Sequence, residues 1–439
     1  MAGKKKQAQL TPEEKLQQAL VPTAEQPYKV PANWCWTRQN IACYLSDIEK
    51  IVNGEHPYLE AKFLRGLKKP KIVSAGKFIN KSSKVILVDG ENSGEVFDIF
   101  VDGYMGSTFR LLCFSEIVYE QYCRYFIIIN KEIYSKSKKG SAIPHLNKEL
   151  FFNMPFPLPP LTEQQRIVER IESLFAKLDE AKENLQNVLD GFETCKAAIL
   201  HKAFTGELTA NWRKQHGVSM DSWEEKRLGK VCKINPSKIN TKNLSDDLEV
   251  SFFPMVSLSE ITGEIVGPEI RTLGKVKNGF TNFSEGDVVF AKITPCMENG
   301  KSAIIGKLIN DIGYGTTEFY VLRCGEELSN KYLHHIVRSK KFRDEAKQNM
   351  TGAVGQQRVP KKYMEDYMLN LPTFYEQTEI VRIIDDLLAK EQQAKELAEN
   401  ALAKIDLIKK SILARAFRGE LGTNNPADEP AVELLKRML

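Results

Sequence analysis

Lysine, arginine, glutamine and hydroxyl side chains are grouped in predicted loops of both halves of the chain. In the N-terminal half the group comprises Lys68, Lys69, Lys71, Lys77, Lys81, Lys84, Tyr104, Ser107, Thr108, Lys136, Lys138, Lys139 and Ser141. In the C-terminal half it comprises Lys275, Lys277, Lys292, Lys301, Tyr314, Thr316, Thr317, Gln356, Gln357 and Arg358. Lys and Arg neutralise phosphates, while Gln can form two hydrogen bonds to adenine and Arg two to guanine. These residue types predict a DNA-binding surface.

Each of these residues also has a simpler explanation. A single lysine is more often a solvated surface charge, and Tyr104 and Tyr314 are suited to packing in a core. For the two loops that precede long predicted helices, at 136–141 and 351–358, binding and simple solvation explain the residue types equally well.

The sequence lacks the motifs of the main enzyme classes. There is no GxGxxG after a strand, no P-loop, no HExxH and no GxSxG. Asn235-Pro236-Ser237 does not complete the motif with which adenine methyltransferases hold a flipped base. The eight cysteines form no CxxC pair, and His334-His335 has no second ligand pair nearby. We therefore expect no catalytic residue, no metal and no cofactor in this chain.

An internal repeat organises the sequence. Residues 158–208 align with 371–421 without a gap, and about 23 of the 51 aligned residues are identical, far more than chance gives. Both copies show apolar residues at alternating spacings of three and four, which predicts two long helices with a heptad seam. Gly206 and Gly419 stand where these helices should end. The predicted seam consists of Ile167, Ile171, Leu174, Leu178, Leu185, Phe192, Ile199, Ile380, Ile384, Leu387, Ile405, Ile408 and Ile412.

The segments between the predicted helices have a different texture. Short runs of β-branched and aromatic residues, such as 84–88 and 318–322, alternate with Gly, Asn, Asp and Pro, which indicates strands and turns. We therefore predict an α+β fold in which two mainly β domains with short helices are separated by two long antiparallel helices, as a pseudo-twofold repeat.

Composition sets the remaining bounds. The 439 residues suffice for two or three domains, and the net charge of +5 excludes a polybasic protein but not a locally basic DNA-binding face. Reduced thiols, the lack of a signal-peptide pattern at the N-terminus and the lack of a long apolar stretch predict a cytoplasmic protein. Short helices are expected at Thr11–Leu20 and Pro430–Leu439.

Several segments resemble a known family. The stretches 158–168 and 371–381, the Ala-Phe-x-Gly-Glu-Leu endings at 203–208 and 416–421, and 290–301 are similar to specificity subunits of type I restriction-modification systems. The segment 140–146 is similar to the part that precedes the family's conserved helix. The resemblance covers nearly the whole chain.

The resemblance implies a domain plan and a set of partners. It implies an N-terminal extension at 1–29, target-recognition domains at 30–157 and 210–370, spacer helices at 158–209 and 371–422, and a tail at 423–439. Each recognition domain would read one half of a split DNA site. Two methyltransferase subunits and the restriction-translocase subunits would supply the chemistry, and S-adenosylmethionine, ATP and Mg would bind to them. The two terminal helices would lie near each other or contact a methyltransferase subunit.

Three alternatives remain open at the level of sequence. The long helices form a plain coiled coil without a measuring role, the β domains belong to a scaffold that binds protein, or the chain is an orphaned copy without working partners. Strong salt dependence of binding to duplex DNA would separate the DNA-binding role from the scaffold, because phosphate contacts release counterions.

Overall fold

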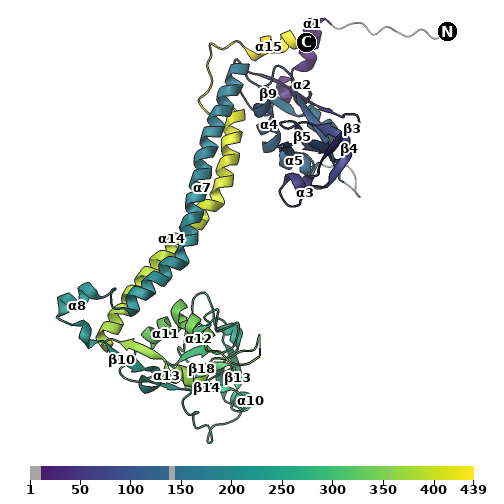
Figure 1. The fold of residues 1–439 in the computed structure, drawn as a ribbon. Helices are drawn as coiled ribbons and strands as arrows, with labels where there is room; N and C mark the ends of the chain where they lie inside the picture. Colours follow the sequence, from purple (N-terminus) through teal and green to yellow (C-terminus); the bar gives the residue numbers. More distant parts are fainter. Residues whose placement is uncertain (1–10, 138–143, 354) are drawn as a thin grey trace. The chain divides into compact units, whose positions relative to one another are not determined.

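The computed structural model describes residues 11–137, 144–353 and 355–439, and combines helices with strands (Figure 1). The chain forms two compact units: unit 1 comprises Met1–Leu185 with Asn400–Leu439, and unit 2 comprises Gln186–Glu399. The expected α+β class is confirmed. Within the described ranges, no helix is both long and apolar enough to span a bilayer.

Unit 1 contains three groups of paired strands. A four-stranded sheet has the order β2 (Cys43–Ser46), β8 (Phe109–Phe114), β5 (Lys84–Leu87) and β6 (Val96–Asp98). A second group pairs β3 (Ile51–Leu59), β4 (Ile72–Ile79) and β7 (Gly103–Met105) in a closed set. The third is the antiparallel pair β1 (Cys35–Arg38) and β9 (Pro155–Leu158).

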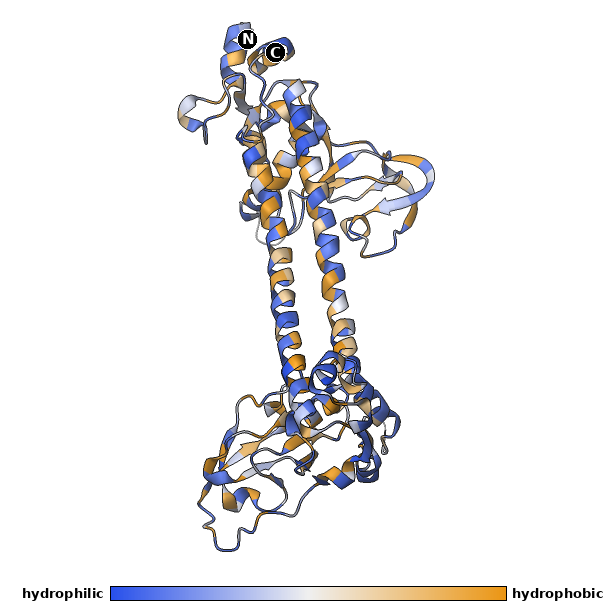
Figure 2. Ribbon diagram, turned by 90° about the vertical axis from the view of Figure 1, so that its left-hand side faces the viewer, coloured by the Kyte–Doolittle hydropathy of each residue, from blue (hydrophilic) through white to orange (hydrophobic). Residues whose placement is uncertain are grey.

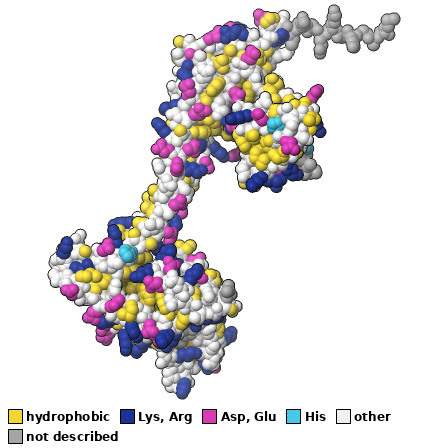
Figure 3. Space-filling view, viewed as in Figure 1, with side chains coloured by type: hydrophobic (Ala, Val, Ile, Leu, Met, Phe, Trp, Pro, Cys, Tyr) yellow, Lys and Arg dark blue, Asp and Glu magenta, His cyan; other side chains and the backbone are white. Residues whose placement is uncertain are grey.

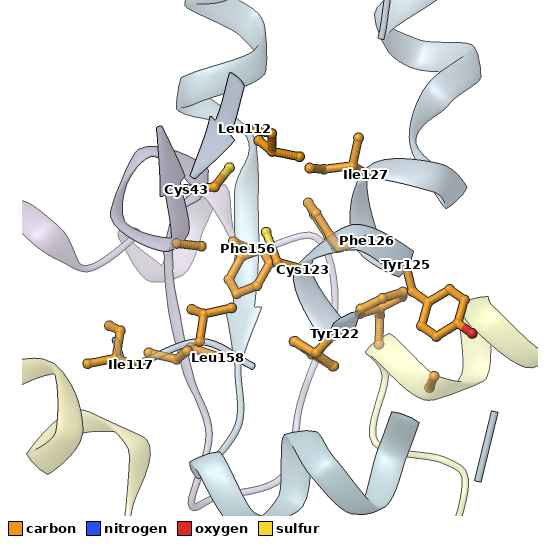
Figure 4. Packing of buried hydrophobic residues seen from close by; sticks show 14 of the residues in the cluster. Cys43, Leu112, Ile117, Tyr122, Cys123, Tyr125, Phe126, Ile127, Phe156 and Leu158 are labelled. Carbon is orange, nitrogen blue, oxygen red and sulfur yellow. The ribbon is translucent and has the colours of Figure 1, made fainter. Parts of the chain in front are cut away.

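The shorter helices of unit 1 surround these strands. They are α1 (Pro12–Ala19), α2 (Gln39–Ala42), α3 (Ala61–Leu64), α4 (Glu120–Ile129), α5 (Lys131–Lys136), α6 (Lys148–Asn153), α15 (Ala431–Met438) and the 3-10 helix η1 (Thr23–Glu25). As expected, the terminal helices α1 and α15 are adjacent, and the Lys15 ammonium donates to the Leu439 carbonyl at 2.9 Å. The core joins β9 to α4, since the Phe156 ring lies 4.9 Å from that of Phe126 (Figure 4).

Unit 2 contains three sheets. The antiparallel pair is β10 (Glu224–Arg227) with β19 (Met368–Leu371). One four-stranded sheet has the order β11 (Cys232–Ile234), β18 (Phe319–Cys324), β15 (Val288–Ala291) and β16 (Ser302–Ile304). The other has the order β13 (Glu269–Thr272), β12 (Glu249–Phe253), β17 (Gly313–Gly315) and β14 (Thr281–Phe283). The shorter helices of unit 2 are α8 (Ala210–His216), α9 (Leu228–Val231), α10 (Leu273–Val276), α11 (Asn330–Arg338), α12 (Lys340–Gln348), α13 (Lys361–Asp366) and the 3-10 helices η2 (Met220–Ser222), η3 (Met255–Ser257) and η4 (Ile309–Asp311).

The two units repeat one framework. The sheet order β2-β8-β5-β6 of unit 1 corresponds to β11-β18-β15-β16 of unit 2, and the pair β1-β9 corresponds to β10-β19. Equivalent tyrosines make equivalent bonds: Tyr122 of α4 donates to the Pro157 carbonyl at 2.9 Å, and Tyr332 of α11 donates to that of Asn370 at 3.1 Å. The duplication detected in the long helices therefore extends through both globular parts.

The two long helices form as predicted. Helix α7 covers Leu161–Phe204 and α14 covers Phe374–Phe417, and apolar and polar residues alternate along both (Figure 2). The buried seam residues are Ile167, Ile171, Ile380, Ile384 and Ile405, and the half-buried ones are Leu174, Leu178, Leu185, Phe192, Ile199, Leu387 and Ile412.

One seam residue was predicted wrongly. Ile408 is 44% exposed, whereas Leu413 is buried and Lys409 lies with its ammonium 5.0 Å from the centre of the Phe175 ring. A straight α-helix advances 3.6 residues per turn, so a strict heptad drifts away from the contact face. Lys409 takes the position next to α7 instead, and its ammonium pairs with Asp179 at 2.5 Å.

The C-terminal end of α14 depends on a glycine. Gly419 has φ +73°, and a Cβ there would lie 2.5 Å from Cγ of Pro31. Gly422 has a similar φ of +71°, but a Cβ there would meet nothing within 4 Å. We expect Gly419→Ala to lower the free energy of unfolding by about 1–3 kcal/mol more than the matched control Gly422→Ala, because only the first adds overlap to the strain in φ. Chemical denaturation of both variants measures the difference, and equal losses would show that Pro31 moves aside freely.

Candidate nucleic-acid interface

Three distant segments of unit 2 meet at the end of β15. The Lys292 amide donates to the Glu318 carbonyl at 3.0 Å, and the Lys292 carbonyl accepts from the Val359 amide at 2.9 Å. The Thr294 amide then donates to the Gln357 carbonyl at 3.0 Å. These backbone bonds fix the loop before α13 to the strand β15 and to the loop before β18.

The guanidinium of Arg358 is held in place where these segments meet. Its Nε and Nη2 donate to the two carboxylate oxygens of Glu318 at 3.0 and 2.8 Å, and its Nη1 donates to the Gln356 carbonyl at 3.0 Å. The bond from Arg358 holds the pKa of the Glu318 carboxyl below its usual value, so the carboxylate stays ionised. Arginine has five N–H donors, and three are used here, so two remain on a side chain that is 43% exposed. These two free N–H donors of the guanidinium can bind guanine or a phosphate.

Other predicted residues of unit 2 lie on the same segments. The Lys292 ammonium is 5.4 Å from the centre of the Tyr320 ring, and Lys301 reaches the Met255 carbonyl at 3.4 Å. Gln356 and Thr317 are exposed, whereas Gln357 and Thr316 are half-buried. The cluster thus contains Lys292, Lys301, Thr316, Thr317, Gln356, Gln357 and Arg358, which we call the unit 2 loop cluster.

Two other lysines of unit 2 lie around α10 instead. Lys275 is exposed within that helix, and Lys277 follows its end and pairs with Asp246 at 2.5 Å. They belong to the sheet that contains β12 and β13, because α10 packs against those strands. The structure therefore does not join them to the unit 2 loop cluster through any bond among the described residues.

In unit 1 the predicted lysines are concentrated after α3. Lys69 and Lys71 are exposed on the loop that leads to β4, and Lys68 pairs with Glu60 at 2.9 Å. Figure 3 shows Lys and Arg side chains gathered over this part of unit 1. An exposed basic loop of this kind suits contacts to a phosphate backbone.

Not every predicted lysine of unit 1 is available to a ligand. Lys84 is largely buried, and its ammonium lies 3.2 Å from Asp98 and 3.0 Å from Glu120. Lys77 forms an ion pair with Asp47. The prediction that Lys84 contacts DNA is therefore corrected, because two carboxylates already compensate its charge inside the fold.

The two tyrosines were also placed wrongly. Tyr104 and Tyr314 are buried, and the Tyr104 hydroxyl lies 2.8 Å from the Asn53 amide and the Ser74 carbonyl. A ring enclosed in this way packs in the core and cannot stack on a base. The alternative stated for these residues, packing, is what the structure shows.

The remaining predicted residues of unit 1 occupy several positions. Lys81 and Lys136 are exposed, and Ser107 and Thr108 lie in the loop between β7 and β8. Lys138, Lys139 and Ser141 lie outside the described residues.

Sequence reasoning missed Glu318, which orients Arg358. Its only signal was an acidic residue at the start of a predicted strand, and 40 positions separate it from its partner. A buried anchor on α14 was missed as well. Glu376 accepts bonds from Thr209, Arg213 and Trp223 at 2.7, 2.6 and 3.0 Å.

The equivalent anchor of unit 1 uses different donors. Glu163 of α7 accepts from Trp34 and Asn424, both at 2.8 Å, and burial raises the pKa of its carboxyl. In each unit the next residue is a buried glutamine: Gln164 accepts from the Tyr119 amide at 2.7 Å, and Gln377 accepts from that of Ser329 at 2.8 Å. Each globular part is thus fastened to the first turn of a long helix by the same Glu-Gln pair.

Comparison with known proteins identifies the family of this framework. The sequence profile of the type I restriction modification DNA specificity domain matches residues 39–190 and 220–400. The chain is 35% identical over 260 residues to the specificity subunits of the EcoEI and EcoAI type I restriction enzymes of Escherichia coli. These alignments cover 50% of this chain and 43% and 44% of the relatives, so the chain spans less than half of their length.

A solved structure shows the same fold. The HsdS subunit from Thermoanaerobacter tengcongensis superposes with a TM-score of 0.62 and 19% sequence identity, covering 91% of this chain and 100% of that chain. At this identity the likeness concerns the fold alone.

Proposed function

Because this chain belongs to the family of type I restriction modification DNA specificity domains, we propose that it recognises a split sequence in double-stranded DNA. Each unit reads one half of the site, and the two long helices set the distance between the halves. The chain supplies recognition and no chemistry. This role accords with a sequence that lacks the motifs of the main enzyme classes.

One observation carries this proposal: the two units share a framework but present different surfaces. Equivalent backbone bonds and Glu-Gln anchors support a loop cluster with an arginine in unit 2 and a loop rich in lysine in unit 1. Binding residues lie disproportionately on loops that a rigid scaffold positions. A duplicated scaffold with divergent loops is what reading two different half-sites requires.

The partners follow from the same role. We infer that methyltransferase subunits dock on the long helices and bring S-adenosylmethionine to adenine, and that translocase-nuclease subunits bring ATP and Mg.

The six positions that we propose for direct contact with DNA in unit 2 are Lys292, Lys301, Thr317, Gln356, Gln357 and Arg358. In unit 1 we propose Lys68, Lys69 and Lys71.

Salt dependence of duplex binding tests the phosphate contacts of unit 1. We expect the triple variant Lys68→Gln, Lys69→Gln, Lys71→Gln to weaken binding to all duplex sequences about equally. The slope of log affinity against log salt should fall by about 2–3, since each phosphate contact contributes about 0.9. The measurement is fluorescence anisotropy of a labelled duplex between low and physiological salt, with the full complex.

A matched triple variant controls for the loss of charge. Lys15, Lys29 and Lys436 are also exposed in unit 1, and α1 and α15 lie at the opposite end of that unit from α3 (Figure 1). Their replacement by glutamine should leave the slope almost unchanged. If both triple variants lower the slope equally, binding follows net charge and the loop after α3 is not the phosphate contact. If neither the wild-type complex nor the two variant complexes bind duplex DNA, the chain is a protein scaffold instead.

A further inference from the structure

The segment before α6 in unit 1 is built like the segment before α13 in unit 2. The Val88 amide donates to the Thr108 carbonyl at 2.9 Å, and the Val88 carbonyl accepts from the Leu146 amide at 2.8 Å. Lys292 of unit 2 makes the same two bonds, to Glu318 and Val359. Val88 and Lys292 are therefore equivalent, and so are Leu146 and Val359.

This correspondence places His145 where unit 2 has Arg358. Each is the residue before the equivalent Leu146 or Val359, and each forms an isolated β-bridge with the strand end beside it, His145 with Asp89 and Arg358 with Ile293. Carrying the 213-residue offset of the repeat upstream also pairs His145 with Arg358, although the two segments share few residues, and His145 was not among the predicted contact residues.

Both residues are held by a carboxylate. The His145 Nδ1 lies 2.7 Å from the Asp89 carboxylate, as Arg358 lies 2.8 Å from that of Glu318. The acid comes from a different strand in each unit, since Asp89 follows β5 whereas Glu318 precedes β18. What the two units have in common is thus a nitrogen-bearing side chain at one position, oriented by a nearby acid.

We propose that His145 is the specificity-determining residue of unit 1, as Arg358 is of unit 2; this inference rests on the proposed function. The side chain of His145 is 55% exposed. No hydrogen bond to its Nε2 occurs among the residues that the structure describes. The bond at Nδ1 fixes the ring while Nε2 is left to face a ligand.

The hydrogen-bonding capacity of His145 Nε2 indicates which base edges it can bind. An ionised carboxylate only accepts hydrogen bonds, so Nδ1 carries the proton, and Nε2 is an acceptor when the ring is neutral and a donor when the ring is charged. In the major groove the hydrogen-bond donors are the N4 amine of cytosine and the N6 amine of adenine. Arg358 offers only donors, which match the O6 and N7 acceptors of guanine. With its ring neutral, His145 therefore accepts hydrogen bonds from a base edge where Arg358 donates them.

The test compares the methylation motifs of variant complexes with that of the wild-type complex. In cells that contain the partner subunits, His145→Ala should reduce methylation of the wild-type site about ten- to hundredfold and loosen one base pair in one half of the motif. Asp89→Asn should reduce it less, because the histidine remains but loses its fixed orientation. Arg358→Ala should loosen the other half, and His216→Ala, at an exposed histidine of unit 2, should change neither.

Four outcomes decide the matter. Loosening confined to the half that Arg358→Ala leaves intact supports the inference, provided that the melting temperature of His145→Ala matches that of the wild type. An unchanged motif with His145→Ala, or loosening of the same half as with Arg358→Ala, overturns it. If the wild-type complex itself gives no split motif, the proposed function fails and the inference falls with it.

Discussion

We expect Glu376→Gln to destabilise unit 2 by about 3–5 kcal/mol, whereas Glu163→Gln at the equivalent position of unit 1 should cost about 1 kcal/mol or less. Both carboxylates are buried at the start of a long helix. Only Glu376 compensates a buried cation, since Arg213 donates to it at 2.6 Å and its side chain is 10% exposed. A glutamine at 376 leaves that guanidinium without a counter-charge.

The donors around Glu163 explain the smaller cost there. Trp34 and Asn424 are neutral and donate to the same carboxylate oxygen, so the one amide oxygen of a glutamine can accept both hydrogen bonds. Burial raises the pKa of the Glu163 carboxyl, which means that its surroundings disfavour the charge. The glutamine thus removes a charge that the site tolerates poorly.

Urea denaturation followed at both units measures the two losses. Adding Arg213→Met to Glu376→Gln should recover part of the stability, because the unpaired charge is then removed. Equal losses for the two glutamine variants would contradict the assignment of Arg213 as the source of the difference.

The second large effect is expected at the unit 2 loop cluster. Arg358→Ala should lower discrimination at one base pair of one half-site by about 1–3 kcal/mol and leave the other half-site unaffected. Glu318→Gln should give an intermediate loss, because the guanidinium keeps its charge but loses its bidentate partner. Competition between the methylated target duplex and duplexes altered at single positions measures the discrimination.

Another arginine of the same unit provides the control. Arg382 also donates twice to a carboxylate, that of Glu379, at 2.8 and 2.7 Å, and its side chain is 65% exposed on α14. Arg382→Ala removes the same charge and the same kind of ion pair. A loss of discrimination with Arg358→Ala but not with Arg382→Ala supports a role of Arg358 in reading the base. Equal losses with the two variants would show that Arg358 contributes only surface charge.

Regular features of the fold were predictable from sequence because they repeat at short intervals. The heptad pattern locates α7 and α14, and alternating runs locate strands such as β5 and β18. Glycines with positive φ close the long helices at Gly206 and Gly419, as predicted. Each of these signals depends on residues only a few positions apart.

Interactions between distant segments were not predictable in this way. The residues around Lys84 in the sequence do not indicate that Glu120 will compensate its charge. Those around Glu318 do not indicate that it will pair with Arg358. The 213-residue offset of the repeat pairs His145 with Arg358, but the residue types differ, and the backbone bonds that make the two positions equivalent appear only in the folded chain. Ile408 was misplaced because a strict heptad drifts relative to the 3.6 residues per turn of an α-helix.

The central claim is that this chain decides which DNA sequence its partners act on. The most direct test is methylation sequencing of DNA from cells that express the chain with its neighbouring methyltransferase subunits, compared with cells that lack only this chain. The account predicts a split, adenine-methylated motif that disappears when the chain is absent. The same methylation pattern with and without the chain, while the methyltransferase subunits are expressed and active, would contradict it.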